Sequence, residues 1–427
     1  MTIFLLFISL FFLIFSLKKT INGYIYYVTL LLISIYCFLI SLGSLNLLFY
    51  DFANYWSNNG IVLNGEISSF YALLILIIYA SLFLISETIF KKKKLDIFGF
   101  NEILNKNVLN KIYYFSILIS ILIFVHVFCM NWSILWSNST YLLIGSLDSL
   151  IYTNIYTKMI HMLYPLLGLI ACMIFIISYL YKDYKTLFII CLPTIFSILL
   201  KIAEHSRYSS LYIAAMILCV LFFSKNKYQK IFISVFLSII FLFNLMNSLV
   251  GRMNNDHGFY SLRKYFDYIY ISFENGDLEN TFMNIFEGVF VYGESFSYFW
   301  HEYPFIYKIL SLSPLPSFID GYSEKASYYT FMLNPYVPMG AVGEIIIFGL
   351  PYMIYYIFII SLSIILNFLC LKKNMIFAFT FGLLLIVLAS YLQFTYPIRN
   401  IFRFFYLSIF ISIFFLYIRR MRWGVNR

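Results

Sequence analysis

The sequence predicts an all-α polytopic membrane protein with about eleven transmembrane helices and one large loop outside the membrane. Of its 427 residues, 62% are hydrophobic and only 11% are charged, and the mean hydropathy is +0.87, so charges are too few to cover a soluble domain of this size. The apolar runs are continuous over about 20 residues instead of alternating over about 10, which predicts helices and not a β-barrel. One long stretch, 251–344, is too polar to be a span.

Eleven apolar runs follow one another, each long enough or nearly long enough to cross about 30 Å of hydrocarbon. Their approximate bounds are 2–17, 22–49, 67–90, 112–132, 159–181, 186–203, 208–224, 231–250, 338–368, 374–394 and 402–418. The first run lacks a basic start, so we interpret it as a span and not as a cleavable signal peptide. The chain then divides into eight spans with short loops (1–250), a large loop (251–337), and three spans with a basic tail (338–427).

Basic clusters between the spans predict the topology. They are Lys18 with Lys19, Lys91–Lys94 with Lys106 and Lys111, Lys182 with Lys185, Lys225 with Lys227 and Lys230, Lys372 with Lys373, and Arg419 with Arg420 and Arg422. Because cytoplasmic loops carry the excess of Lys and Arg, placing every cluster in the cytoplasm fits all the loops. The amino terminus and loop 251–337 are then outside, and the carboxyl terminus is inside. The net charge of +10 therefore indicates topology, and we expect no nucleic-acid partner.

The large loop is expected to contain amphipathic helices. Apolar residues recur at spacings of three and four, which predicts a helix that lies in the membrane interface or caps the bundle. These residues are Phe259, Leu262, Phe266, Ile269 and Phe273. A second helix is predicted from Leu278 to about Tyr292.

Proline crowds the second half of this loop. Six of the chain's nine prolines lie between Pro304 and Pro351. Proline fixes the backbone and removes a hydrogen-bond donor, so Ser313–Pro316 and Pro335–Pro338 are predicted to be rigid, irregular segments at the membrane surface. Such segments suit a shaped site better than a tether.

Ionisable residues that enter helices in a bilayer are costly and usually functional. Lys201, Glu204, His205 and Arg207 fall in the turn between two spans on the predicted outer side. Glu204 and Arg207, three residues apart, have the spacing of an interfacial ion pair that ends a helical hairpin. The alternative is a polar site, because four ionisable residues exceed what a hairpin needs.

Arg399 and Arg403 flank the start of the last span on the outer side, against the positive-inside trend. A spacing of four places them on one helix face. Two guanidiniums on one face suit a pyrophosphate, which needs bidentate donors and charge neutralisation. The alternative is that both side chains extend to lipid headgroups.

Other candidates lie in the large loop. Arg252 is at the exit of the eighth span, and His301 and Glu302 follow an aromatic patch at 298–300. Aromatic faces beside acidic groups are suited to stacking sugar rings and binding their hydroxyls, although aromatic residues are also common at membrane interfaces.

The most specific feature is the segment Pro338-Met-Gly-Ala-Val-Gly-Glu344 at the head of a span. Its two glycines allow close approach of a backbone or a ligand, and Glu344 is then held near the membrane surface. This carboxylate is suited to act as a general base on a hydroxyl or to pair with an arginine such as Arg207. It is equally suited to complement a helix dipole.

We expect neither a cofactor nor a metal. The six cysteines all lie in apolar runs without a CxxC pair, and no cluster has convincing metal-ligand spacing. A P-loop, a dinucleotide fingerprint and a Ser-x-x-Lys motif are also missing from the sequence, which disfavours nucleotide-dependent chemistry.

The chain resembles bacterial O-antigen polymerases of the Wzy type. The resemblance is carried by the span count, the late outer loop, the Glu204-His-Ser-Arg207 turn, and the segment Asn334-Pro-Tyr-Val-Pro-Met-Gly-Ala-Val-Gly-Glu344. It implies a glycosyltransferase of the GT-C superfamily at the periplasmic face of the bacterial inner membrane. Such an enzyme transfers a growing glycan from undecaprenyl pyrophosphate to a sugar hydroxyl of the next lipid-linked repeat unit. A chain-length regulator protein and membrane lipids are the implied partners.

The candidate residues fit this chemistry in the following roles. The substrate-binding candidates, for pyrophosphate or glycan, are Arg207, Arg252, Arg399, Arg403, Glu204, His205 and Tyr336. The catalytic candidates are Glu344, Glu302 and His301, with a carboxylate as the base.

Three alternatives stay open. An O-antigen ligase shares this architecture and the lipid-linked donor but uses the lipid A core as acceptor. A lipid-linked oligosaccharide flippase should show repeated halves and charges along its spans, whereas here the charges collect at one face. The third alternative is an assembly protein without catalytic activity.

Overall fold

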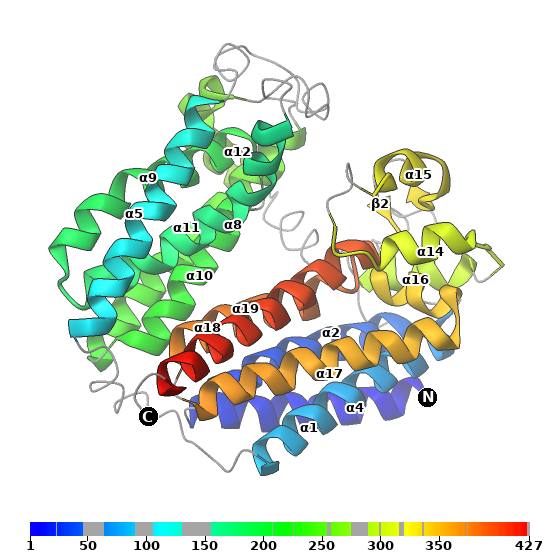
Figure 1. The fold of residues 1–427 in the computed structure, drawn as a ribbon. Helices are drawn as coiled ribbons and strands as arrows, with labels where there is room; N and C mark the ends of the chain where they lie inside the picture. Colours follow the sequence, from blue (N-terminus) through cyan, green and yellow to red (C-terminus); the bar gives the residue numbers. More distant parts are fainter. Residues whose placement is uncertain are drawn as a thin grey trace. The chain divides into compact units, whose positions relative to one another are not determined.

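The computed structural model describes residues 1–22, 24–45, 64–89, 106–129, 155–206, 208–224, 226–253, 258–274, 289–298, 300–315, 320–334, 337–373 and 375–424. This part of the chain is almost entirely helical, and its strands are the short β1 (Met332–Asn334) and β2 (Val337–Pro338). The chain forms two compact units. The first consists of Met1–Leu95 and Asn284–Arg427, and the second of Asp96–Met283. Each unit is a helical bundle (Figure 1).

Long helices form the frame of the first unit. Those described are α1 (Thr2–Ile21), α2 (Val28–Ser44), α4 (Gly65–Ile89), α17 (Leu350–Lys372), α18 (Ile376–Leu392) and α19 (Ile398–Gly424), with the 3-10 turn η1 (Ile25–Tyr27) between the first two. The helix α2 packs against α1, α4 and α18, and α19 packs against α17 and α18.

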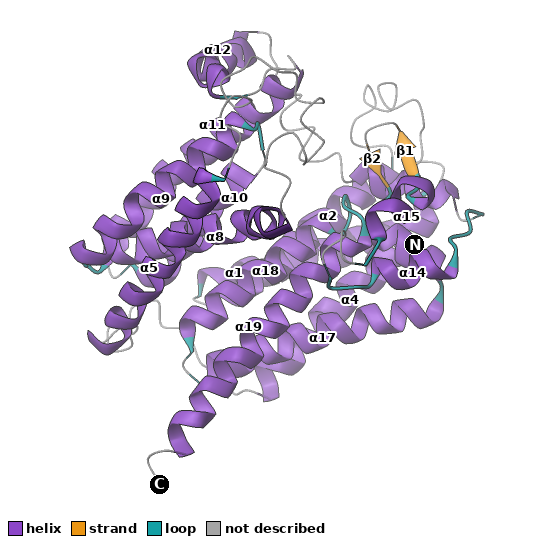
Figure 2. Cartoon of the chain, turned by 45° about the horizontal axis from the view of Figure 1, so that its top comes forward, coloured by secondary structure: helices purple, strands orange, loops and turns teal. Residues whose placement is uncertain are grey.

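Short elements gather at one end of this frame (Figure 2). They are a helical segment at 289–295, η5 (Phe296–Tyr298), α14 (Phe305–Ser311), α15 (Tyr322–Tyr329), the antiparallel β1–β2 pair, and α16 (Ala341–Phe348). Hydrogen bonds attach them to the start of α4, where the side chain of Asn64 donates to Ser297 and the hydroxyl of Tyr292 donates to the carbonyl of Ser68. The opposite end carries Lys19, whose Nζ lies 2.8 Å from buried Glu87. Lys19 belongs to a predicted cytoplasmic cluster, so the short elements occupy the end away from that cluster.

The second unit is also a bundle. It contains α5 (Lys106–Phe128), α8 (Ile155–Leu180), α9 (Tyr184–Ala203), α10 (Tyr208–Phe223) and α11 (Lys227–Met253), followed by η4 (Phe259–Lys264) and α12 (Tyr265–Glu274). Ile123, Leu167 and Leu200 belong to a core shared by α5, α8 and α9. The helix α9 starts at an N-cap residue, Asp183, whose carboxylate accepts hydrogen bonds from the backbone N–H and the hydroxyl of Thr186.

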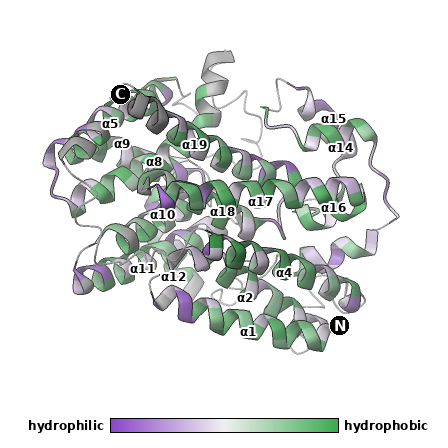
Figure 3. Ribbon diagram, turned by 60° about the horizontal axis from the view of Figure 1, so that its bottom comes forward, coloured by the Kyte–Doolittle hydropathy of each residue, from purple (hydrophilic) through white to green (hydrophobic). Residues whose placement is uncertain are grey.

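Seven of the described helices are long and apolar enough to cross a membrane, judged by length and composition. They are α1, α4, α8, α9, α11, α17 and α19, and shorter apolar helices lie within α2, α5, α10 and α18. Each of the eleven predicted apolar runs therefore contains a helix, and hydrophobic residues cover most of the helices (Figure 3). Phe188 and Phe232 are 85% and 75% exposed, as expected of surfaces in contact with lipid. The fold is consistent with a polytopic membrane protein.

The predicted span 338–368 is wrong as a single helix. The chain forms α16 up to Phe348, breaks at Gly349 and starts α17 at Leu350. Gly349 has a φ of +101°, which side-chain-bearing residues rarely adopt, and Pro351 fixes the first turn of α17. The break separates the segment with Glu344 from the long helix α17.

The predicted helix at 259–273 is present, but part of its apolar face differs. Phe266 is 75% exposed, whereas Tyr268 and Ile269 are buried. The first part of this segment, Phe259–Lys264, is a 3-10 helix, and an exposed Phe266 in α12 is compatible with the predicted position in the membrane interface. Of the second predicted helix, residues 278–288 lie outside the described part of the chain, and 289–292 are helical.

Candidate active site around Glu344

Glu344 lies in the first turn of α16 and is buried, with 1% of its surface exposed. Its Oε2 accepts a hydrogen bond of 2.6 Å from the backbone N–H of Ile398, the first residue of α19. Its Oε1 accepts a hydrogen bond of 3.3 Å from the hydroxyl of Tyr307 in α14. A carboxylate in this position complements the dipoles of both α16 and α19, as one of the sequence-based alternatives expected.

Backbone contacts hold the start of α16 against the turn before α19. The N–H of Ala341 donates to the carbonyl of Tyr396 at 2.8 Å, and the N–H of Val342 donates to that of Gln393 at 3.2 Å. A Cβ on Gly340 would lie 2.3 Å from the carbonyl oxygen of Phe394, so a side chain does not fit there. The close approach predicted from the glycines is therefore, at Gly340, an approach of two backbone segments.

The environment of Glu344 makes its proton exchangeable near neutral pH. Burial raises the pKa of the Glu344 carboxyl to about 7, although the hydrogen bonds from Ile398 and Tyr307 oppose this shift. Burial and the nearby charge of Glu344 raise the pKa of the Tyr307 hydroxyl, so Tyr307 stays a neutral donor. A carboxyl with these properties is suited to general acid or base catalysis.

Tyr307 is the centre of a group of tyrosines that covers Glu344. Its hydroxyl lies 3.4 Å from that of Tyr322 in α15 and 3.3 Å from Oγ1 of Thr330. Its ring stacks on that of Tyr303 with centroids 5.1 Å apart. The elements α14 and α15 therefore close the site on the side of Glu344 that faces Tyr307.

Arg399 is buried, with 2% of its surface exposed, and binds the segment after α14. Its guanidinium donates to Asp320 Oδ2 at 2.6 Å, to the carbonyl of Leu315 at 2.8 Å and to the carbonyl of Leu310. Its Cζ also lies 4.0 Å from the centroid of the Tyr322 ring. Burial pushes the pKa of Asp320 upward, but hydrogen bonds from Arg399 and Ser313 outweigh burial and hold it below the usual range. Arg399 thus fixes an irregular segment to α19 and does not extend to lipid.

Arg403 lies one turn further along α19 and is only half-buried. Its Nη2 donates to the carbonyl of Leu315 at 2.7 Å, the same carbonyl that Arg399 binds. The structure therefore brings the two predicted arginines together at one carbonyl oxygen.

His301 and Glu302 lie between η5 and α14, before Tyr303. The imidazole of His301 packs between the rings of Tyr303 and Phe331, at centroid distances of 4.5 and 4.6 Å. Partial burial lowers the pKa of His301, which favours the neutral imidazole at pH 7. Glu302 is exposed, in contrast to Glu344.

The remaining candidates are Glu204, His205, Arg207, Arg252 and Tyr336. In the second unit Glu204 Oε2 lies 2.5 Å from Lys201 Nζ. The ion pair predicted between Glu204 and Arg207 stays a prediction. His205 is buried and has a φ of +45°. Arg207 and Tyr336 lie outside the described residues. Arg252 is part of α11, but its side chain also lies outside the description.

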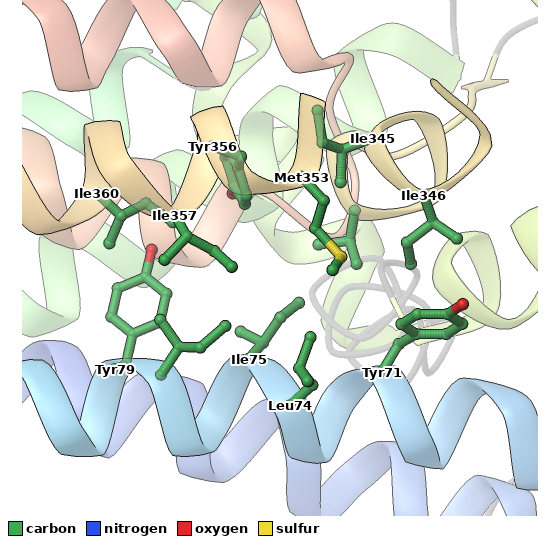
Figure 4. A pocket seen from close by; sticks show the side chains of 12 residues that line it. Tyr71, Leu74, Ile75, Tyr79, Ile345, Ile346, Met353, Tyr356, Ile357 and Ile360 are labelled. Carbon is green, nitrogen blue, oxygen red and sulfur yellow. The ribbon is translucent and has the colours of Figure 1, made fainter. Parts of the chain in front are cut away.

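A small apolar groove lies in the first unit, between α4 and α17 with α16 at one end (Figure 4). Apolar atoms line it, because the hydroxyl of Tyr356 donates to Gln393 and that of Tyr79 accepts from Ser390. Its lining residues are Tyr71, Leu74, Ile75, Ile78, Tyr79, Val342, Ile345, Ile346, Met353, Tyr356, Ile357 and Ile360. Val342 and Ile345 flank Glu344 on α16, so this groove adjoins the candidate site.

Sequence reasoning missed Tyr307, Tyr322 and Asp320. Tyrosine is too common here, with 39 in the chain, for any one of them to give a signal. Asp320 follows a proline-rich segment, and its partner Arg399 is 79 residues away. Among the described residues no group of three or more His, Cys, Asp or Glu side chains is placed to hold a metal ion. No protein-family model matches the chain, and no curated protein or solved structure is significantly similar to it.

Proposed function

We propose that the chain is a membrane glycosyltransferase that polymerises undecaprenyl-pyrophosphate-linked oligosaccharide repeat units, like the Wzy-type O-antigen polymerases that its motifs resemble. The observation that carries the proposal is the buried Glu344, whose carboxyl has a pKa of about 7. Arg399 follows directly after Ile398, whose N–H binds this carboxylate, and Arg403 lies one turn further along α19. A buried base and a guanidinium that can bind phosphate, carried by the same helix start, are the groups that glycosyl transfer from a pyrophosphate needs.

In this proposal Glu344 is the general base. The acceptor hydroxyl takes the place of the Tyr307 hydroxyl and gives its proton to the Glu344 carboxylate. The acceptor oxygen then forms a bond to the anomeric carbon of the donor glycan. The bond between that carbon and the pyrophosphate oxygen breaks, and its electron pair leaves with undecaprenyl pyrophosphate. Displacement of Tyr307 requires α14 and α15 to move when the substrate binds.

The arginines have different roles in this scheme. Arg403 binds the leaving pyrophosphate, because a phosphate oxygen is a stronger acceptor than the Leu315 carbonyl that its Nη2 contacts at 2.7 Å. Arg399 is neutralised by Asp320 and positions the segment around Leu315.

The other parts of the proposal follow from the resemblance and the charge pattern. We propose about eleven spans in a GT-C-like arrangement, in the bacterial inner membrane, with the amino terminus and Glu344 at the periplasmic face and the carboxyl terminus in the cytoplasm. Arg207, Arg252, Glu204, His205 and Tyr336 are further candidates for contacts with glycan or pyrophosphate. A chain-length regulator is the proposed protein partner.

The test is the lipopolysaccharide pattern of a host strain in which the gene is deleted and then restored. The proposal predicts that deletion reduces the ladder to core plus a single repeat unit. The wild-type gene restores the ladder, and the Glu344→Gln gene does not. Core without any repeat unit after deletion would overturn the polymerase proposal, and polymer accumulating on the undecaprenyl carrier outside would then identify a ligase.

A further inference from the structure

An exposed tryptophan lies at the edge of the tyrosine group that covers Glu344. Trp300 is 71% exposed, and its ring centroid lies 6.3 Å from that of His301 and 6.1 Å from that of Tyr298. The exposed carboxylate of Glu302 follows two residues later. A flat aromatic surface, an imidazole and a carboxylate thus come from one short segment.

Contacts with other elements hold this segment in place. The rings of Tyr298 and His301 each lie 4.6 Å from that of Phe331, centroid to centroid. The carbonyl of Phe331 accepts a hydrogen bond from the N–H of Met339, just before α16. The aromatic surface is therefore attached to the same short elements that carry Glu344.

Ring contacts also lead from this surface to the base. His301 packs edge to face on Tyr303 at 4.5 Å, Tyr303 stacks on Tyr307 at 5.1 Å, and Tyr307 donates its hydrogen bond to Glu344. These contacts join the exposed ring of Trp300 to Tyr307, the residue that covers Glu344.

We propose that Trp300, His301 and Glu302 form a glycan-binding surface that holds a neutral or amino sugar of the substrate beyond the residue that reacts. This inference rests on the proposed function, and it gives His301 and Glu302 a binding role in place of catalysis. The indole face stacks on the C–H face of the sugar, while the imidazole and the carboxylate accept its hydroxyl hydrogens. The negative charge of Glu302 disfavours acidic sugars.

The test measures glycan binding without turnover. The probe is the lipid-free oligosaccharide released from the host's own lipopolysaccharide, added to the full-length protein in detergent. We expect Trp300→Ala to weaken binding about three- to tenfold, which corresponds to the loss of one aromatic stacking contact, and Trp300→Tyr to restore most of it. Phe305→Ala is the matched control, because Phe305 is also 71% exposed at this end of the unit and is not part of the proposed surface.

The outcomes separate the two proposals. Weaker binding in Trp300→Ala but not in Phe305→Ala supports the glycan-binding surface, whether or not the protein polymerises. Equal binding in all variants overturns it, while a ladder that is lost on gene deletion and restored by the wild-type gene would leave the polymerase proposal standing. Equal losses in Trp300→Ala and Phe305→Ala also overturn it, because they indicate a general interface effect.

Discussion

The backbone N–H of Ile398 donates a 2.6 Å hydrogen bond to Glu344, 54 residues earlier in the chain. This bond joins the first turn of α16 to the first residue of α19. The next residue, Arg399, ties α19 to Asp320. Two adjacent residues at the start of α19 therefore hold the buried Glu344 and the segment that contains Asp320.

The first prediction concerns the pH dependence of activity. Only ionised Glu344 acts as a base, and its pKa is about 7. The rate with saturating lipid-linked substrate should therefore rise about tenfold from pH 6 to pH 8. Initial rates in proteoliposomes across this range provide the measurement. A flat profile would exclude Glu344 as the base that limits the rate.

The second prediction concerns stability. The folded-state pKa of Glu344, about 7, lies above its ordinary value of 4.5, so between these two pH values the folded protein binds more protons than the unfolded chain. The contribution of the Glu344 carboxyl to the free energy of unfolding is fully present below about pH 4.5. It is lost as the pH rises to 7, and the total loss is roughly 3 kcal/mol. Glu344→Gln has no such titration. Its melting temperature relative to wild type should therefore rise between pH 5 and pH 8, and parallel curves for the two proteins would contradict the account.

The third prediction separates Arg399 from Arg403. Arg399→Ala leaves Asp320 without its buried partner, and the loss should be roughly 3–5 kcal/mol, visible as a lower melting temperature. Arg403 is only half-buried, so Arg403→Ala should leave the melting temperature nearly unchanged. The same substitution should reduce the activity, because Arg403 is proposed to bind the leaving pyrophosphate. Paired replacement, Arg399→Met with Asp320→Leu, should recover part of the stability and some activity. A stable but fully inactive double variant would show that Arg399 contacts the substrate itself.

The fourth prediction concerns Gly340, four residues before Glu344. Gly340→Ala would place a Cβ 2.3 Å from the carbonyl oxygen of Phe394, so α16 and the turn before α19 must separate. We expect a cost of about 1–3 kcal/mol from overpacking, together with a loss of activity because Ile398 moves away from Glu344. Gly349→Ala is the comparison, since it meets no atom within 4 Å and carries only the strain of a φ of +101°. Similar activities for the two variants would contradict a role for the close contact at Gly340.

Long apolar runs made most of the helices predictable. A run of about 20 apolar residues has few other solutions in a bilayer, because every backbone hydrogen bond must be made within the segment. The helix break at 349 has a signal in the sequence, because Gly349 and Pro351 both disfavour a continuous helix. The apolar run continues on both sides of these residues, and it therefore predicted a single span. The 3-10 start at Phe259 leaves no such mark in the sequence.

The candidate site was predictable only where charge is unusual. Glu344, Arg399 and Arg403 are conspicuous because they lie next to apolar helices. Their partners are not, since Tyr307 is 37 residues from Glu344 and Asp320 is 79 residues from Arg399. Contacts over such separations depend on how α14 and α15 pack, which no local pattern encodes.

The most direct measurement of the central claim is a turnover assay with purified protein in liposomes that contain undecaprenyl-pyrophosphate-linked repeat units. We predict that the wild-type protein lengthens the glycan and releases one undecaprenyl pyrophosphate for each unit joined. Glu344→Gln should do neither, although it is folded and membrane-inserted. Polymer formation by Glu344→Gln at the wild-type rate would contradict the account.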